Sequence, residues 1–143
     1  MKDVRLVAQS MGGWTCLDYA LRHPGKVRAL VMASTSGAID PGKLAGDGAA
    51  EIGKWQEAMP KLHADLMARD IGLASGARMA AEQPALALLY RQILQLTPAD
   101  FRAAVLARIV QLRVQAPQVL ARLPMPVLFL TGSEDCLFPA AAG

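Results

Sequence analysis

The residues with the clearest potential for catalysis lie close to the start of the chain, in the run Val7-Ala8-Gln9-Ser10-Met11-Gly12-Gly13. A serine that ends a buried strand and opens a helix is the setting of a nucleophile elbow, a tight turn that exposes the hydroxyl. The turn needs small residues two positions before and two positions after the serine, and Ala8 and Gly12 meet this need. The pattern therefore predicts that Ser10 is a catalytic nucleophile.

Two neighbours of Ser10 would complete such a site. A helix that begins at this turn directs unpaired backbone N–H groups toward the serine, where the negative charge of an oxyanion would develop. We expect the Met11 N–H to be one oxyanion donor and Gln9 to contact the substrate. The alternative is a structural turn, in which Ser10 only caps the helix by accepting hydrogen bonds from its first N–H groups.

A second group that could take part in catalysis lies in residues 132–139. This segment follows an apolar run, and the catalytic groups of open α/β sheets gather where the strands end. Asp135 could orient and stabilise a histidine that acts as the base for Ser10, and Glu134 is the less favoured candidate for the same role. The alternative is that Asp135 only shapes the turn through hydrogen bonds to its own backbone.

The chain has two histidines, and neither is an obvious general base. His23 closes the helix that begins beside Ser10, and at 1.5 Å per residue it would lie roughly 20 Å from the serine. His63 belongs to a helical region far along the chain, where we expect a solvated surface side chain. The proton acceptor that Ser10 needs is therefore missing from the pattern.

Three short apolar runs, at residues 4–8, 27–33 and 127–131, supply the elements that would position these groups. Continuous apolar runs bounded by Gly and Pro are typical of parallel strands that are buried on both faces. Residues 14–23 have apolar side chains at three- and four-residue spacing, which indicates an amphipathic helix. The order strand, helix, strand predicts a βαβ unit and an α/β fold with three parallel strands.

A long helical insertion separates the second strand from the third. Residues 34–53 hold five of the chain's twelve glycines and suggest a mobile connection. Helices are expected from there to about residue 116, one of them starting with Thr97 as N-cap and Pro98 as its first residue. We therefore divide the chain into three parts: 1–36 as a core β-α-β unit with the elbow, 37–116 as a helical cap, and 117–143 as a core helix, strand and acid turn. The acid turn is the segment 132–139, which contains Asp135.

Residues 4–36 and 123–139 resemble the α/β-hydrolase superfamily, and in particular the capped serine hydrolases with a Ser-Met-Gly-Gly elbow. The resemblance implies that Ser10 is the nucleophile, that Asp135 is the triad acid and that the inserted helices form a cap over the site. It implies hydrolysis of a small ester-like substrate without a cofactor, with carbon–carbon bond hydrolysis and haloperoxidase chemistry left open. By resemblance the chain is the middle of such an enzyme, so the second oxyanion donor and the histidine would lie outside it, leaving this chain weakly active or inactive.

Composition limits the other function classes. The net charge is +3, but the basic residues are scattered singly, so we expect no nucleic-acid partner. The apolar runs are too short to cross a membrane, and the two cysteines with two histidines show no metal-ligand spacing. Two cysteines also favour a reducing, cytoplasmic setting. Because the sheet would have open apolar edges, we expect the chain to self-associate.

Two alternatives remain from the sequence. Residues 37–43 match the G-x-x-x-x-G-K pattern of a phosphate-binding loop. Three features oppose this interpretation: Leu44 replaces the Ser or Thr that would hold Mg²⁺, and Pro41 lacks the N–H that would bind phosphate. In addition, Gly46 and Gly48 disfavour the helix that should follow the loop. The second alternative is a non-catalytic remnant or interaction module of the same fold, which the missing base leaves open.

Overall fold

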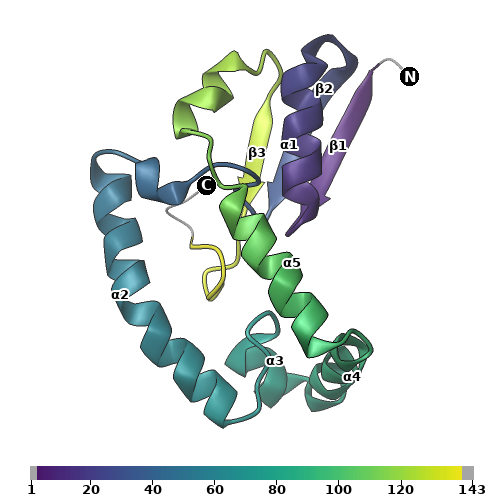
Figure 1. Cartoon of the computed structure of the whole chain (residues 1–143), viewed down its shortest axis with the longest axis vertical. Helices are drawn as coiled ribbons and strands as arrows, with labels where there is room; N and C mark the ends of the chain where they lie inside the picture. The colour runs from purple at the N-terminus through teal and green to yellow at the C-terminus, as the bar shows by residue number, and fades with distance from the viewer. Residues whose placement is uncertain (1–2, 140–143) are drawn as a thin grey trace.

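The computed structural model describes residues 3–139 and contains one three-stranded parallel sheet. The strands are β1 (Val4–Gln9), β2 (Val27–Ala33) and β3 (Val127–Leu130), paired in the order β1-β2-β3 (Figure 1). The predicted strand positions and their parallel arrangement are confirmed, with boundaries that differ by at most one residue. The partial α/β-hydrolase architecture expected from the resemblance therefore forms.

The helix α1 (Gly12–Arg22) connects β1 to β2 and packs on one face of the sheet. Its residues Leu17 and Ala20 are fully buried against Leu30 and Met32 of β2, which are themselves almost fully buried. These positions recur at the three- and four-residue spacing that places side chains on one side of a helix. The predicted βαβ unit is thus the core of the described structure.

The opposite face of the sheet is uncovered within residues 3–139, contrary to the expectation of burial on both faces. Val7 is 75% exposed, and Leu128 and Leu130 are 52% and 49% exposed. The strands carry apolar side chains on both faces, but the helices that Figure 1 shows beside the sheet leave this side open. The apolar sequence of these strands correctly predicted a parallel sheet, but the prediction that both faces of the sheet are buried is wrong for the described residues.

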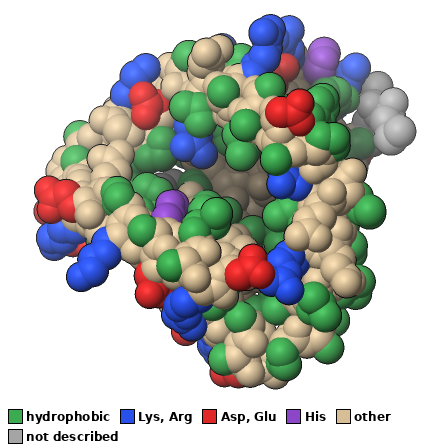
Figure 2. Space-filling model, turned by 60° about the horizontal axis from the view of Figure 1, so that its bottom comes forward, with side chains coloured by type: hydrophobic (Ala, Val, Ile, Leu, Met, Phe, Trp, Pro, Cys, Tyr) green, Lys and Arg blue, Asp and Glu red, His purple; other side chains and the backbone are tan. Residues whose placement is uncertain are grey.

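The insertion between β2 and β3 contains four α-helices. They are α2 (Asp47–Ala68), α3 (Gly76–Glu82), α4 (Pro84–Gln95) and α5 (Ala99–Gln111), preceded by the short 3-10 turn η2 (Pro41–Lys43) and followed by η3 (Pro117–Arg122). In Figure 1, α2 and α5 run away from the sheet on two sides, and α3 and α4 join them at the far end. Figure 2 shows the molecule hollowed between these helices, with hydrophobic side chains around the hollow.

Three details of the insertion differ from expectation. The helix α2 begins at Asp47, so Gly46 and Gly48 do not prevent a helix there. Leu44 at the position of the Mg²⁺ ligand and the missing N–H of Pro41 remain arguments against a phosphate-binding loop. Thr97 is not the N-cap of α5: its N–H donates to the Leu94 carbonyl, closing the preceding helix, and Pro98 occupies the cap position. The expected core helix after residue 116 is only the 3-10 turn η3.

Candidate active site

Ser10 sits in a strained turn between β1 and α1. Its φ angle is +50°, a left-handed backbone that costs a residue with a side chain about 1–2 kcal/mol. The turn is held on both sides, because the Ser10 N–H donates to the Ala33 carbonyl at 3.1 Å and the Ser10 carbonyl accepts the Gly13 N–H at 3.0 Å. Ser10 is exposed, so the backbone presents the residue to solvent at the end of the sheet. Such strain at one exposed serine is typical of a functional turn.

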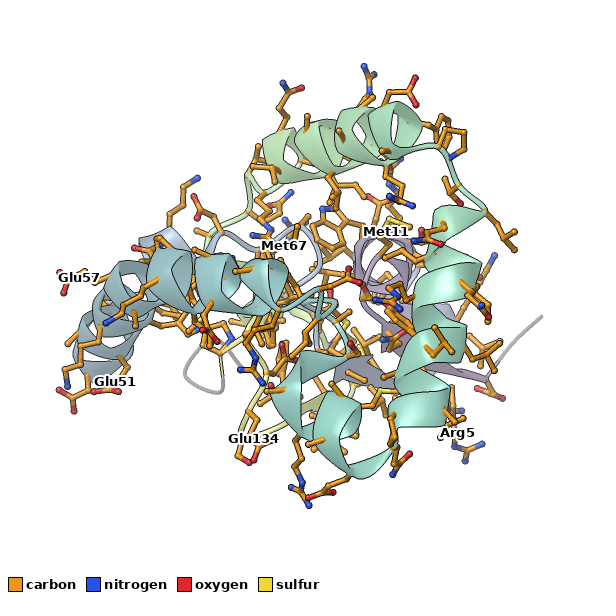
Figure 3. All side chains as sticks on the ribbon, turned by 90° about the horizontal axis from the view of Figure 1, so that it is seen from below. Arg5, Met11, Glu51, Glu57, Met67 and Glu134 are labelled. Carbon is orange, nitrogen blue, oxygen red and sulfur yellow. The ribbon has the colours of Figure 1, made fainter. Side chains whose placement is uncertain are left out.

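Met11 follows this turn as the N-cap of α1. Within residues 3–139 its N–H has no hydrogen-bond partner, so the donor expected for an oxyanion is unengaged. The first helical N–H groups lack intrahelical partners by geometry, and they attract negative charge. In Figure 3, which looks onto the molecule from below, Met11 lies toward the middle of the view among the inserted helices.

Asp135 makes the hydrogen bonds to its own turn that the sequence left as an alternative. Its Oδ1 atom accepts the backbone N–H groups of Leu137 and Phe138, both at 2.9 Å, and its own N–H donates to the Gly132 carbonyl at 3.1 Å. The carboxylate therefore does shape the turn. Its other oxygen, Oδ2, has no partner among the described residues and is available for a different group.

A cavity of about 680 Å³ brings Ser10 and Asp135 together. The two residues come from the carboxyl ends of β1 and β3, which lie on either side of β2. Gln9 lines the same cavity, whereas Met11 is not among the lining residues. The other walls come from the inserted helices and the acid turn: Ser34, Leu62, Leu66, Leu73, Ala74, Ser75, Gly76, Ala77, Arg78, Gly132, Ser133, Glu134, Cys136 and Leu137.

Neither histidine lines this cavity. His23 lies at the far end of α1, where its ring packs on Tyr19 with centroids 4.7 Å apart. His63 is half-buried, not solvated as expected, and its Nε2–H donates to the Cys136 carbonyl at 3.0 Å. Its ring therefore ties the acid turn to α2.

Two further contacts tie the acid turn to the inserted helices. Cys136 is 4% exposed, and its thiol donates to the Leu73 carbonyl at 3.0 Å. Burial raises the pKa of the Cys136 thiol, and the neighbouring Asp135 charge raises it further, so the sulfur stays protonated. Arg78 of α3 lies 3.8 Å from Glu134 and also donates to Glu82 at 3.1 Å. Glu134 is thus linked to the insertion by an exposed ion pair, and it lines the cavity together with Asp135.

Ser34, which also lines the cavity, was not predicted as a site residue. It follows the last residue of β2, has a φ angle of +47°, and donates its N–H to the Leu130 carbonyl at 2.7 Å. Its position after the central strand was the one available signal.

Within residues 3–139, no group of three or more His, Cys, Asp or Glu side chains could hold a metal ion, and both cysteines are free. Among the same residues, no helix combines the length and apolar character that a bilayer crossing requires.

The family comparison agrees with this geometry. The model of the family described as "Serine aminopeptidase, S33" matches residues 1–143. The chain belongs to this family of α/β-hydrolases. No curated protein and no solved structure matches it. Membership therefore places this chain in a family of hydrolases.

Proposed function

We propose that this chain of the hydrolase family carries the nucleophile and the acid of a serine hydrolase that acts on carboxylic esters or related acyl compounds. The observation that carries the proposal is the strained, exposed Ser10, which shares one cavity with Asp135. The family description names aminopeptidases, so amide substrates belong among the acyl compounds to be tested. Six of the lining residues are Leu or Ala, which favours an apolar acyl or leaving group.

In the proposed reaction, Ser10 Oγ attacks the carbonyl carbon of the substrate while a histidine takes its proton. The Met11 N–H and a second donor hold the negative charge of the tetrahedral oxyanion. Asp135 uses its free Oδ2 to orient the histidine, because Oδ1 is engaged with the backbone. The histidine then protonates the leaving group, and water releases the acyl group from the serine.

The histidine is the open part of this proposal. His23 and His63 are the only two in the sequence, and neither lines the cavity. We infer that the base comes from outside this chain and that the chain alone turns over substrate slowly or not at all. The alternative is a non-catalytic interaction module of the same fold, which would also have no histidine at the cavity.

Chemical rescue with free imidazole distinguishes a serine hydrolase that lacks its base from a non-catalytic module. A fluorophosphonate probe labels only an activated serine, and free imidazole can supply the absent base if the cavity accepts it. We expect labelling of the wild-type chain to rise with imidazole and to saturate, and Ser10→Ala to remain unlabelled at every concentration. Ser133→Ala, which removes another serine of the cavity wall, is the matched control and should label as the wild type does. Labelling that does not depend on Ser10, or that imidazole never raises, would favour the non-catalytic module.

A further inference from the structure

Two unpartnered buried donors of the described chain belong to residues that line one cavity, and a third belongs to a residue beside one of them. Within residues 3–139, three buried side-chain nitrogen atoms lack a hydrogen-bond partner: Trp14 Nε1, Trp55 Nε1 and Arg113 Nε. The Arg113 guanidinium lies over the Trp14 ring, 5.5 Å from its centroid. Arg113 and Trp55 line a common cavity. All three atoms are donors, so the group they lack is an acceptor.

That cavity is distinct from the one at Ser10 and has a volume of about 270 Å³. It lies where η2, α2, the end of α5 and the acid turn meet, and its walls are mainly apolar. The lining residues are Asp40, Pro41, Gly42, Ile52, Trp55, Gln56, Val110, Arg113, Leu137, Phe138 and Pro139. A largely apolar cavity with a few polar groups is the usual form of a small-molecule site, and this volume is just below the roughly 300–1,000 Å³ typical of such sites.

The charged side chains in the lining of the cavity are Arg113 and Asp40. Arg113 is half-buried, and no carboxylate among residues 3–139 lies within ion-pair distance of it. Asp40 also lines the cavity, but its Oδ1 accepts the Gly42 N–H at 3.0 Å. An anion that binds Arg113 would be repelled by Asp40, and a dianion such as phosphate would be repelled more than a monoanion.

We propose that this cavity is a binding site for a small apolar carboxylic acid, held by its carboxylate against Arg113 and Trp55. A guanidinium presents planar paired donors that match the two oxygens of a carboxylate, and the Trp55 indole N–H adds a third donor. The hydrocarbon part of the ligand would contact Ile52, Val110 and Phe138. Occupation would satisfy donors whose burial without partners is unfavourable. The site does not depend on Ser10 being a nucleophile.

The two tryptophans make the test direct, because the chain has no others and each gives one indole N–H signal in a ¹⁵N-resolved NMR spectrum. We would titrate the full chain with sodium hexanoate, assigning the signals with Trp55→Phe. The expected result is a saturable shift of the Trp55 indole signal, absent with sodium chloride at equal ionic strength. Inorganic phosphate is expected to bind more weakly than hexanoate.

Substitution of Arg113 tests the partner that the proposal names. Arg113→Gln should weaken hexanoate binding by about tenfold or more, whereas Arg108→Gln, which removes an exposed arginine of α5, should leave it unchanged. If Arg113→Gln fails to fold, Arg113→Lys keeps the charge but loses the Nε donor, and it should bind with reduced affinity. No hexanoate shift, a shift equal to that with chloride, binding of phosphate as strong as that of hexanoate, or equal binding by the Arg113 variants would overturn the proposal.

Discussion

Gly13 and Thr35 are in such close contact that no side chain fits between them. A Cβ atom on Gly13 would lie 2.4 Å from Thr35 Oγ1 and 2.6 Å from its Cγ2. Thr35 is 3% exposed, and its Oγ1 accepts the Gly37 N–H at 3.0 Å, so the threonine has little freedom to move. This contact brings the first turn of α1 against the end of β2, and so determines where the turn at Ser10 lies relative to the neighbouring strand.

Gly13→Ala should therefore destabilise the chain. The added methyl group must displace Thr35 or shift α1, and overpacking of this kind costs about 1–3 kcal/mol. We expect a lower midpoint in urea unfolding. Gly12→Ala is the matched control, because a Cβ at Gly12 would meet nothing within 4 Å and alanine is the better helix residue. Equal midpoints for the two variants would contradict the importance of the Gly13–Thr35 contact.

The backbone at Ser10 predicts an unusual order of stability. Ser10→Gly relieves a left-handed conformation with φ of +50°, which Ser10→Ala retains. We expect Ser10→Gly to be more stable than Ser10→Ala by about 1 kcal/mol in chemical denaturation. Thr15 is an exposed position inside α1. There, Thr15→Gly should be less stable than Thr15→Ala, since glycine is about 1 kcal/mol less favourable than alanine in a helix. The same order at both positions would mean that Ser10 is unstrained in solution.

Two substitutions of Asp135 separate its structural role from its proposed catalytic role. Asp135→Asn keeps an oxygen that can accept the Leu137 and Phe138 N–H groups, so its unfolding midpoint should remain close to that of the wild type. Asp135→Ala loses both hydrogen bonds and should be less stable by about 1–3 kcal/mol. Imidazole-supported probe labelling of Ser10 should fall by roughly 10- to 10⁴-fold in both variants. Labelling by Asp135→Asn at the wild-type rate would limit Asp135 to shaping the turn.

The core of the fold could be predicted from the sequence because local patterns and tertiary contacts agree there. Residues 4–33 hold two apolar strands and an amphipathic helix, and Leu17 is buried on the apolar side of that helix, as its spacing predicts. Leu30 and Met32 are buried within the apolar run that predicted β2. The positions of Ser10 and Asp135 at one edge of the sheet follow from parallel topology alone, because parallel strands end at the same edge.

Other features depend on contacts between distant segments, and local patterns do not contain them. A helix that starts near Pro98 was correctly predicted, but Phe101 on this helix is 61% exposed because little packs on α5. His63 and Cys136 are 73 residues apart in sequence, so their hydrogen bond had no local signal. The same holds for the cavity at Arg113, whose walls come from four separate segments.

The uncovered face of the sheet makes self-association the expected behaviour of this chain in solution. Val7, Val31 and Leu128 lie side by side across the three strands, and the outer two are 75% and 52% exposed. Burial of such apolar surface is favourable by about 25 cal/mol per Å², so a second surface should cover it. We expect the mass measured by light scattering after gel filtration to exceed that of one chain and to rise with concentration.

Lysine substitutions on this face provide the check. Val7→Lys combined with Leu128→Lys should shift the chain toward monomers, because charges on exposed strands oppose contact between sheets. Leu96→Lys is the matched control: Leu96 is 82% exposed at the end of α4 and lies outside the sheet, so this change should leave the mass distribution as it is. If the wild-type chain is monomeric across the accessible concentrations, or if Leu96→Lys disperses it as well as the double variant does, the sheet face is not the surface of association.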